Sequence, residues 1–137
     1  MPELAAFPDV EQALMDLLAD LVVDREDVGI IIPIDLQKRV LSDSPRPVIR
    51  VRCIGGSDDR FFDNPRVDVE VFAASRAVAM PLAEAIRQRL ISKPRLTAFG
   101  VIDRADTEVR PQEIPYDDPD IRRISATYRL STRRRVS

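Results

Sequence analysis

The sequence predicts an α+β protein in which two helices pack on one face of a mostly antiparallel sheet of four to five strands. Three observations support this: two segments with apolar residues at helical spacing, several segments that alternate strictly between apolar and polar residues, and the order of these segments along the chain. The 137 residues suffice for one domain with its own core. We therefore expect residues 1–137 to form a single domain.

The two helices are expected over residues 9–23 and 75–92. The first begins at Asp9, which follows a proline, and the second begins at Ser75, a good N-cap residue. Each segment has an apolar stripe at helical spacing, and such a stripe faces a core. The stripe residues are Val10, Leu14, Leu17, Leu18 and Leu21 in the first helix, and Val78, Leu82, Ala85, Ile86 and Leu90 in the second.

Between the first helix and the main strands, the sequence "VGIIIPID" over residues 28–35 indicates a strand. Pro33 has no backbone N–H to donate to a neighbouring strand, so this strand is expected to be short or to lie at an edge of the sheet. Residues 36–47, which include "SDSPRP", are typical of a connector.

The central feature is an antiparallel pair formed by residues 48–54, "VIRVRCI", and 66–72, "RVDVEVF". With Val51 opposite Val69, all apolar residues of both strands share one face and opposite charges meet on the other. A shift of one residue would destroy both patterns. The resulting pairs are Ile49 with Val71, Cys53 with Val67, Arg50 with Glu70, and Arg52 with Asp68.

The sequence between these strands, "GGSDDRFFDNP" over residues 55–65, contains residues that could hold a phosphate or a metal. We interpret it as a hairpin connection of about eleven residues, longer than is usual. Gly55 and Gly56 suit positive φ angles or a bulge. A phosphate loop would precede a helix, whereas a strand follows here. The spacing of the carboxylates fits no familiar calcium loop, so a metal is not expected at Asp58, Asp59 and Asp63.

Two further strands are expected over residues 100–116 and 121–135, joined by the turn "PYDDPD". The last strand alternates clearly between two faces. Ile124, Ala126, Tyr128 and Leu130 share one face, and Arg123, Ser125, Thr127 and Arg129 share the other.

The composition argues against an enzyme. The chain contains no histidine and one cysteine, so the usual general base and zinc sites of the Cys/His type are excluded. The paired carboxylates, Asp58 with Asp59 and Asp117 with Asp118, lie in expected turns, where acidic residues are ordinary. We therefore expect no enzyme activity, no cofactor and no metal.

The charge and hydropathy patterns limit the classes of binding partner and the cellular location that we expect. A net charge of −2 with a pI near 5.2 gives no basic patch for specific nucleic-acid binding. No apolar run is long enough to span a bilayer, and the acidic start does not resemble a signal peptide. We expect no membrane association and a cytoplasmic location.

The sheet face opposite the helices is expected to carry charges of both signs. It is either a solvated surface or a wall of a subunit interface or channel. Phe61 and Phe62 at the hairpin connection are further candidates for an interface, because paired aromatic residues often anchor contacts between proteins. The charged candidates are Arg50, Arg52, Asp68, Glu70, Arg123 and Arg129.

Two runs of the sequence resemble the tail terminator proteins of long-tailed phages, especially those that infect actinobacteria. They are "PVIRVRCIGGSDDRFFDNPRVDVEVFAASRAVAMPLAEAIRQRL" and "PYDDPDIRRISATYRLSTR", and the resemblance extends over residues 45–133. It lies in the order of a strand that ends in "IGGSDD", a strand "VDVEVFA", a helix that begins "SRA" and a last strand "ATYRLSTR". Cys53 departs from the pattern, since this position is often an arginine in the family.

The resemblance implies a structural role in the phage virion. Proteins of this family form rings, usually hexamers, that cap the tail tube, stop its polymerisation and join the tail to the head connector, with DNA passing through the lumen without specific binding. The partners would be other copies of the chain, the major tail tube protein and the head–tail connector protein. The location would be the virion tail or neck, and the host cytoplasm during assembly. Two alternatives stay open: another head–tail connector or neck protein, and a small cytoplasmic α+β binding domain.

Overall fold

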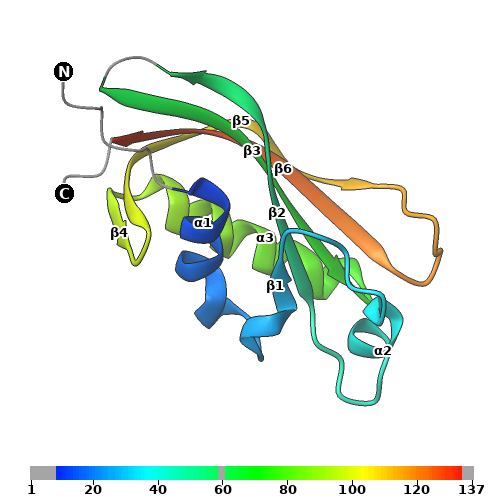
Figure 1. The fold of residues 1–137 in the computed structure, drawn as a ribbon. Helices are drawn as coiled ribbons and strands as arrows, with labels where there is room; N and C mark the ends of the chain where they lie inside the picture. Colours follow the sequence, from blue (N-terminus) through cyan, green and yellow to red (C-terminus); the bar gives the residue numbers. More distant parts are fainter. Residues whose placement is uncertain (1–8, 59–60, 134–137) are drawn as a thin grey trace.

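The computed structural model describes residues 9–58 and 61–133, and within them it has an α+β fold with a curled, six-stranded mixed sheet (Figure 1). The strand order is β1-β2-β3-β6-β5-β4, in which β1 runs parallel to β2 and the other neighbours are antiparallel. The α+β class is confirmed. The prediction of four to five strands and two helices was too low, because the described residues also contain a short edge strand and a third α-helix.

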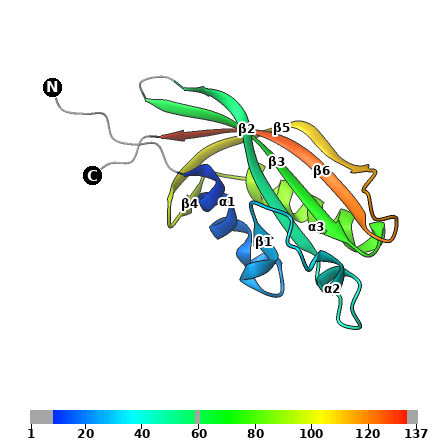
Figure 2. The ribbon, with the colours of Figure 1, turned by 45° about the vertical axis from the view of Figure 1, so that its right-hand side comes forward.

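Helices α1 (Val10–Leu18) and α3 (Arg76–Ile91) lie on the same side of the sheet (Figures 1 and 2). Both begin where the sequence predicts. The Asp9 carboxylate accepts a hydrogen bond from the Gln12 N–H, and the Ser75 hydroxyl accepts one from the Val78 N–H. After α1 the chain tightens into one 3₁₀ turn, η1 (Ala19–Leu21).

The predicted buried stripe of α3 was partly wrong. Ile86 and Leu90 are buried as expected, but Val78 and Ala85 are exposed. The other buried positions are two alanines, Ala79 and Ala83, which continue the spacing of Ile86 and Leu90 along one side of the helix. The exposed side of α3 is apolar near its start, where Ala77, Val78 and Pro81 lie.

Strands β2 (Val48–Asp58) and β3 (Phe62–Ala73) pair in the predicted register. Val51 lies opposite Val69, Arg50 opposite Glu70, and the other predicted pairs follow. The prediction of an eleven-residue connection was wrong. Strand β2 continues beyond Cys53 and β3 begins before Arg66, so the pairing extends to Asp58 opposite Asp63. We call residues 54–58 and 61–64 the arm; residues 59 and 60, between the two strands, lie outside the described residues.

A β-bulge between Cys53 and Gly55 separates the arm from the rest of the hairpin. Gly55 and Gly56 both have a φ of 128°, which confirms the positive φ angles predicted for them. Only Gly56 is also tightly packed: a Cβ atom there would lie 2.3 Å from the Asn64 carbonyl oxygen. The bulge therefore depends on a glycine at position 56 for two separate reasons.

The other half of the sheet consists of β6 (Arg122–Arg133), β5 (Gly100–Ile114) and β4 (Arg95–Thr97). In β6 the predicted inner residues Ile124, Ala126, Tyr128 and Leu130 are all buried. Strand β4 was not predicted. At the opposite edge, β1 (Val28–Gly29) is a short edge strand, as Pro33 indicated, and a 3₁₀ turn, η2 (Arg25–Asp27), leads into it.

The segment expected to be only a connector contains a short helix, α2 (Leu36–Val40). Leu36 and Val40 form a second apolar cluster with Val48 and Phe72 of the sheet and with Ile121. Val48 and Phe72 alternate with Ile49 and Val71, so they point away from α1 and α3. The sheet face opposite the two long helices is thus covered at one end.

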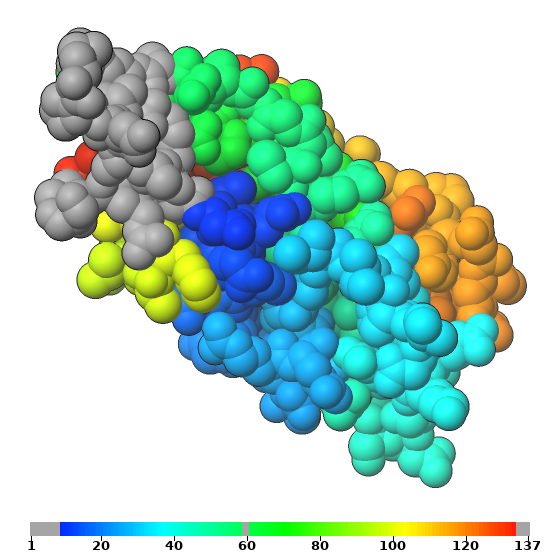
Figure 3. Space-filling model, in the orientation of Figure 1, coloured from blue at the N-terminus to red at the C-terminus, as the bar shows by residue number. Residues whose placement is uncertain are grey.

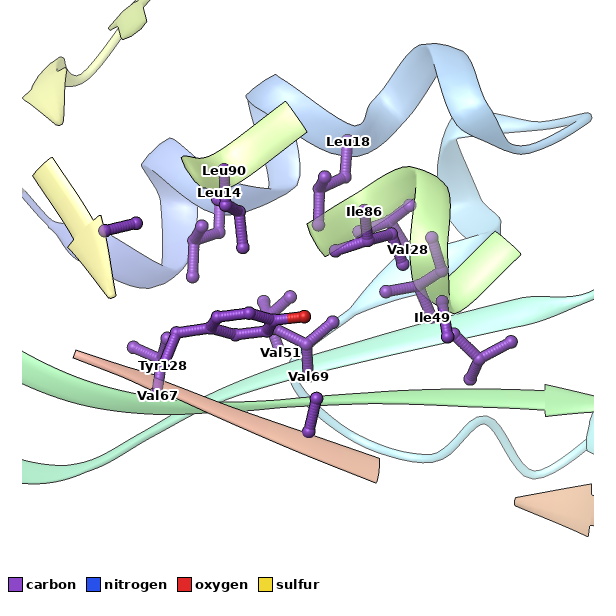
Figure 4. Packing of buried hydrophobic residues seen from close by; sticks show 14 of the residues in the cluster. Leu14, Leu18, Val28, Ile49, Val51, Val67, Val69, Ile86, Leu90 and Tyr128 are labelled. Atoms are coloured by element: carbon purple, nitrogen blue, oxygen red, sulfur yellow. The ribbon is translucent and has the colours of Figure 1, made fainter. Parts of the chain in front are cut away.

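The main core lies between the sheet and the two long helices (Figure 4). The Tyr128 ring packs within it, near Val67, Val69 and Leu14 (Figure 4). Burial raises the pKa of the Tyr128 hydroxyl far above its ordinary value, so this residue stays neutral.

Acidic residues of α1 connect the helix layer to the sheet and to α3. The Glu11 carboxylate accepts a hydrogen bond from the Cys53 N–H of β2 at 3.0 Å, and the Asp16 carboxylate accepts one from the Ala98 N–H after β4 at 2.9 Å. Asp20, in the turn that follows α1, pairs with Arg89 of α3. These contacts fix α1 between the two halves of the curled sheet.

Cys53 differs from its predicted environment. It lies opposite Val67 as expected, but it is exposed, because the helix layer ends near Glu11 and the bulge begins at the next residue. The inner face of β2 is therefore buried only as far as Val51.

The bulge gives the first prediction. Replacing Gly56 by alanine should lower the free energy of unfolding by about 1–3 kcal/mol, because alanine is strained at this φ and collides with the β3 backbone. Gly55→Ala is the matched control, with the same φ and open space around the new methyl group. Urea unfolding of both variants, with amide exchange of the arm, measures the difference. Equal effects of the two changes would contradict the role assigned to Gly56.

Candidate interaction surfaces

The charged face predicted from the sequence is the outer face of the sheet, and Glu70 lies at its centre. The Glu70 side chain is only 7% exposed and pairs with two arginines. Arg50 Nε donates to Glu70 Oε1 at 2.8 Å, and Arg123 Nη1 lies 3.5 Å from Glu70 Oε2. Arg123 also donates to the Pro115 carbonyl and stacks on the Tyr116 ring. This group of charges holds the β5–β6 turn against the sheet.

Asp68, the next carboxylate on the outer face of β3, has weaker partners. Its Oδ1 accepts a hydrogen bond from the Thr127 hydroxyl at 2.7 Å, whereas Arg52 lies 3.8 Å from its Oδ2. The Arg52 side chain is 50% exposed. The predicted Arg52–Asp68 pair therefore exists, but it is a loose pair close to solvent, where such pairs contribute little stability.

Glu108 of β5 was not predicted as part of this face. Its carboxylate accepts hydrogen bonds from Arg66 and Arg129. These bonds lower the pKa of Glu108 below its ordinary value, and the bond from Arg66 has the larger effect. Their contribution to stability is fully present above the ordinary carboxyl pKa and is lost as the pH falls through the lowered pKa. The register shift between Ile102 and Arg104 changes which residues of β5 face outwards, so Glu108 lies on this face although strict alternation from Ile102 could not reveal it.

The three arginines Arg66, Arg104 and Arg129 line an open depression of about 790 Å³ where the arm meets the sheet. Glu108 pairs with the first and third, and Asp106 pairs with Arg104. Most charges of the outer face are thus already paired within the subunit. Of the six charged candidates, Arg52 and Arg129 are the most exposed, with Arg129 at 65%.

The aromatic candidates lie at the end of the arm. Phe61 is 67% exposed and Phe62 is 41% exposed. The structure therefore separates the eight candidate residues into an outer-face group and a pair at the end of the arm, and it does not bring these two sets into one site.

Other large apolar residues are exposed near the two edges of the sheet. Ile31 and Ile34 follow the edge strand β1, and Leu96 lies in the edge strand β4. In the space-filling view, the segments from α1 to α2, coloured blue to cyan, cover one side of the molecule between β4 and the far end of the β5–β6 turn (Figure 3). Exposed apolar residues at sheet edges favour contact with another protein chain.

The carboxylates considered for catalysis or metal binding do not form a site. Asp118 accepts hydrogen bonds from Gln37 and from the Asp120 N–H, so it stabilises the β5–β6 turn. Within residues 9–58 and 61–133, no group of three or more metal-ligating side chains could hold an ion; Asp59 lies outside the described residues. None of the helices in this part of the chain has the length and apolar character needed to cross a membrane.

The second prediction compares the two acidic residues of β3. Glu70→Gln should lower the free energy of unfolding by about 3 kcal/mol, because it leaves two largely buried guanidinium groups without their carboxylate. Asp68→Asn makes the same chemical change one pair further along and should cost under about 1 kcal/mol. Denaturant unfolding of both variants tests the ranking, and similar losses would show that the burial of Glu70 does not determine its role.

Comparison with solved structures shows a likeness in fold. A chain from a solved structure, the virion of a native gene transfer agent particle, aligns with a TM-score of 0.61 at 17% sequence identity, covering 90% of this chain and 94% of that chain. At this identity the likeness shows the fold alone. No curated protein matches the sequence.

The family comparison is more specific. The model of a family described as phage tail termination protein matches residues 6–137, nearly the whole chain. The families of this kind are structural and not enzymatic, in agreement with a chain that lacks histidine. The chain therefore belongs to the phage tail termination protein family and is a structural protein of the phage tail.

Proposed function

We propose that this protein assembles into a ring, a hexamer, on the last ring of the tail tube, where it stops tube polymerisation and joins the tail to the head connector. The observation that supports this most directly is the match to the tail termination family over residues 6–137. Its partners are then other copies of the chain, the major tail tube protein and the head–tail connector protein, and its place is the neck end of the virion tail after assembly in the host cytoplasm.

Features of the surface support assembly through contacts between unlike surfaces. A closed ring requires a heterologous contact, in which one surface of a subunit meets a different surface of the next. The chain offers several surfaces of this kind: the aromatic end of the arm and the exposed apolar residues near β1 and β4.

The outer face of the sheet suits a role beside other subunits or beside the lumen. Its exposed Arg52, which is only loosely paired with Asp68, is available to a carboxylate of a neighbour. Arg129 pairs with Glu108, and Arg50 and Arg123 pair with Glu70. The net charge of −2 also suits a lumen through which DNA passes without specific binding, since tight phosphate binding requires unpaired basic residues.

Tail length tests the proposed function directly. The tube protein alone should form tubes of uncontrolled length, and adding this protein should stop growth and leave a ring at one end of each tube. Electron microscopy of tube lengths and ends provides the measurement. If the added protein neither binds tube ends nor limits length, the proposal fails, and a position elsewhere in the neck or a separate binding function becomes the better explanation.

The arm gives a further prediction for the same assay. Replacing both Phe61 and Phe62 by serine should leave the subunit folded and reduce ring formation at least tenfold, because aromatic anchors dominate many interfaces. The control replaces two exposed apolar residues elsewhere, Leu41 and Val109, by serine. Ring formation that survives the first change, with an unchanged unfolding midpoint, would exclude the arm as a contact.

A further inference from the structure

The first turns of α3 contain a shallow apolar depression at the surface, and of its lining residues Met80 also packs against the subunit's own core. It has a volume of about 690 Å³ and is lined by Arg76, Ala77, Met80, Pro81 and Glu84. We call it the α3 depression. Val78, in the same turns but outside the lining, is 49% exposed. Helix α1 differs from α3 in that its polar side chains Glu11 and Asp16 accept hydrogen bonds from the sheet and from the β4–β5 turn.

The chemistry of the α3 depression suits an aromatic side chain. Ala77 and Pro81 present small apolar surfaces, and Met80 is flexible and interacts favourably with aromatic rings through its sulfur atom. Arg76 and Glu84 supply a charged rim around an apolar centre. An apolar centre within a polar rim is the usual arrangement of a protein–protein contact.

The end of the arm has the complementary chemistry. Phe61 and Phe62 are exposed there, and two carboxylates, Asp58 and Asp63, lie directly opposite each other across the hairpin. The Asp58 carboxylate is exposed at this end of the arm, so a cation of another chain can pair with it. Arg76 on the rim of the α3 depression is a cation in a suitable position for an incoming arm.

The arm cannot reach the α3 depression of its own subunit. The two views show the arm at one end of the molecule and the start of α3 at the other, beside the end of β3 (Figures 1 and 2). A contact between them must therefore join two copies of the chain. Such a contact uses unlike surfaces on each subunit, so it can repeat around a ring.

We propose that Phe61 and Phe62 of one subunit insert into the α3 depression of the next subunit, with Asp58 near Arg76 of that neighbour. This contact rests on the proposed ring and specifies which surfaces meet in it. It gives the ring a direction, because every subunit donates its arm to one neighbour and receives an arm from the other.

One experiment blocks the α3 depression without disturbing the fold. Ala77→Glu fills the depression and adds a negative charge facing the acidic end of the arm. A glutamate in the first turn of a helix also suits the helix dipole, so folding is preserved. Gln88→Glu adds the same charge to exposed α3 surface outside the depression. We expect at least a tenfold loss of ring-capped tube ends for Ala77→Glu and less than a twofold change for Gln88→Glu.

A second experiment traps the contact itself. In a Cys53→Ser background, which removes the chain's one cysteine, Phe61→Cys protein is mixed with Ala77→Cys protein on tail tubes and oxidised. The heterodimer joined through positions 61 and 77 should form at least five times more than the product of Phe61→Cys with Val23→Cys, an exposed position outside the α3 depression. Peptide mass mapping identifies the bond.

The outcomes separate this contact from the proposed function. If the unmodified protein limits tube length but Ala77→Glu does so equally well, the ring stands and the arm-to-depression contact is wrong. If Ala77→Glu fails to cap tubes and the 61–77 bond does not exceed its control, the α3 depression meets a different protein and the proposal is again wrong. If the unmodified protein never caps tubes, the proposed function fails, whatever the cross-linking result.

Discussion

The pairing register of β2 with β3 is the constraint on which most of this structure depends. Val51 opposite Val69 places five apolar residues of the two strands in the core with α1 and α3: Ile49, Val51, Val67, Val69 and Val71. The same register brings Arg50 to Glu70 on the other face. A shift by one residue would expose the apolar side chains and bury the charged ones. The core and the outer ion pairs therefore both depend on the same register.

The bulge at Cys53 and Gly55 ends this arrangement and starts a different one. Before it, β2 has one buried face and one charged face; after it, every residue from Ile54 to Asp58 is exposed. Glu11 at the start of α1 bonds to the Cys53 N–H at this boundary. The hairpin therefore has a half that stabilises the subunit and a half that contributes little to its core. The aromatic residues of the second half, Phe61 and Phe62, stay exposed in the subunit.

How much could be predicted from the sequence follows from the length and regularity of each element. The long elements were predictable: the β2–β3 register, the caps at Asp9 and Ser75, and the inner face of β6 each depend on a pattern repeated several times. Strand β4 and helix α2 were missed, because elements this short depend on packing against the finished fold. The arm was taken for a loop because its glycines and aspartates, and the proline that follows it, are typical of turns, although here they belong to a bulged strand pair.

The candidate site was predictable in part for a related reason. The charged residues of the outer face could be found by alternation, but their burial could not, because it depends on α2 and the β5–β6 turn covering one end of the sheet. Glu108 was missed because a bulge breaks the alternation in β5. The α3 depression is visible in the sequence only as "RAVAMP", a helix start with few charges.

The distribution of paired charges bears on how a ring of such subunits would hold together. A charge that already has a partner gains little from a second one, and moving it out of water at an interface costs free energy. The Glu70 group and the Glu108 group are both paired within the subunit, so they stabilise each copy whether or not it is assembled. The free energy of assembly must then come mainly from exposed apolar surfaces at the arm, at α3 and at the sheet edges. A subunit built in this way can stay folded and separate until a tail end brings several copies together, and in the proposed ring its paired outer charges can face passing DNA without binding it.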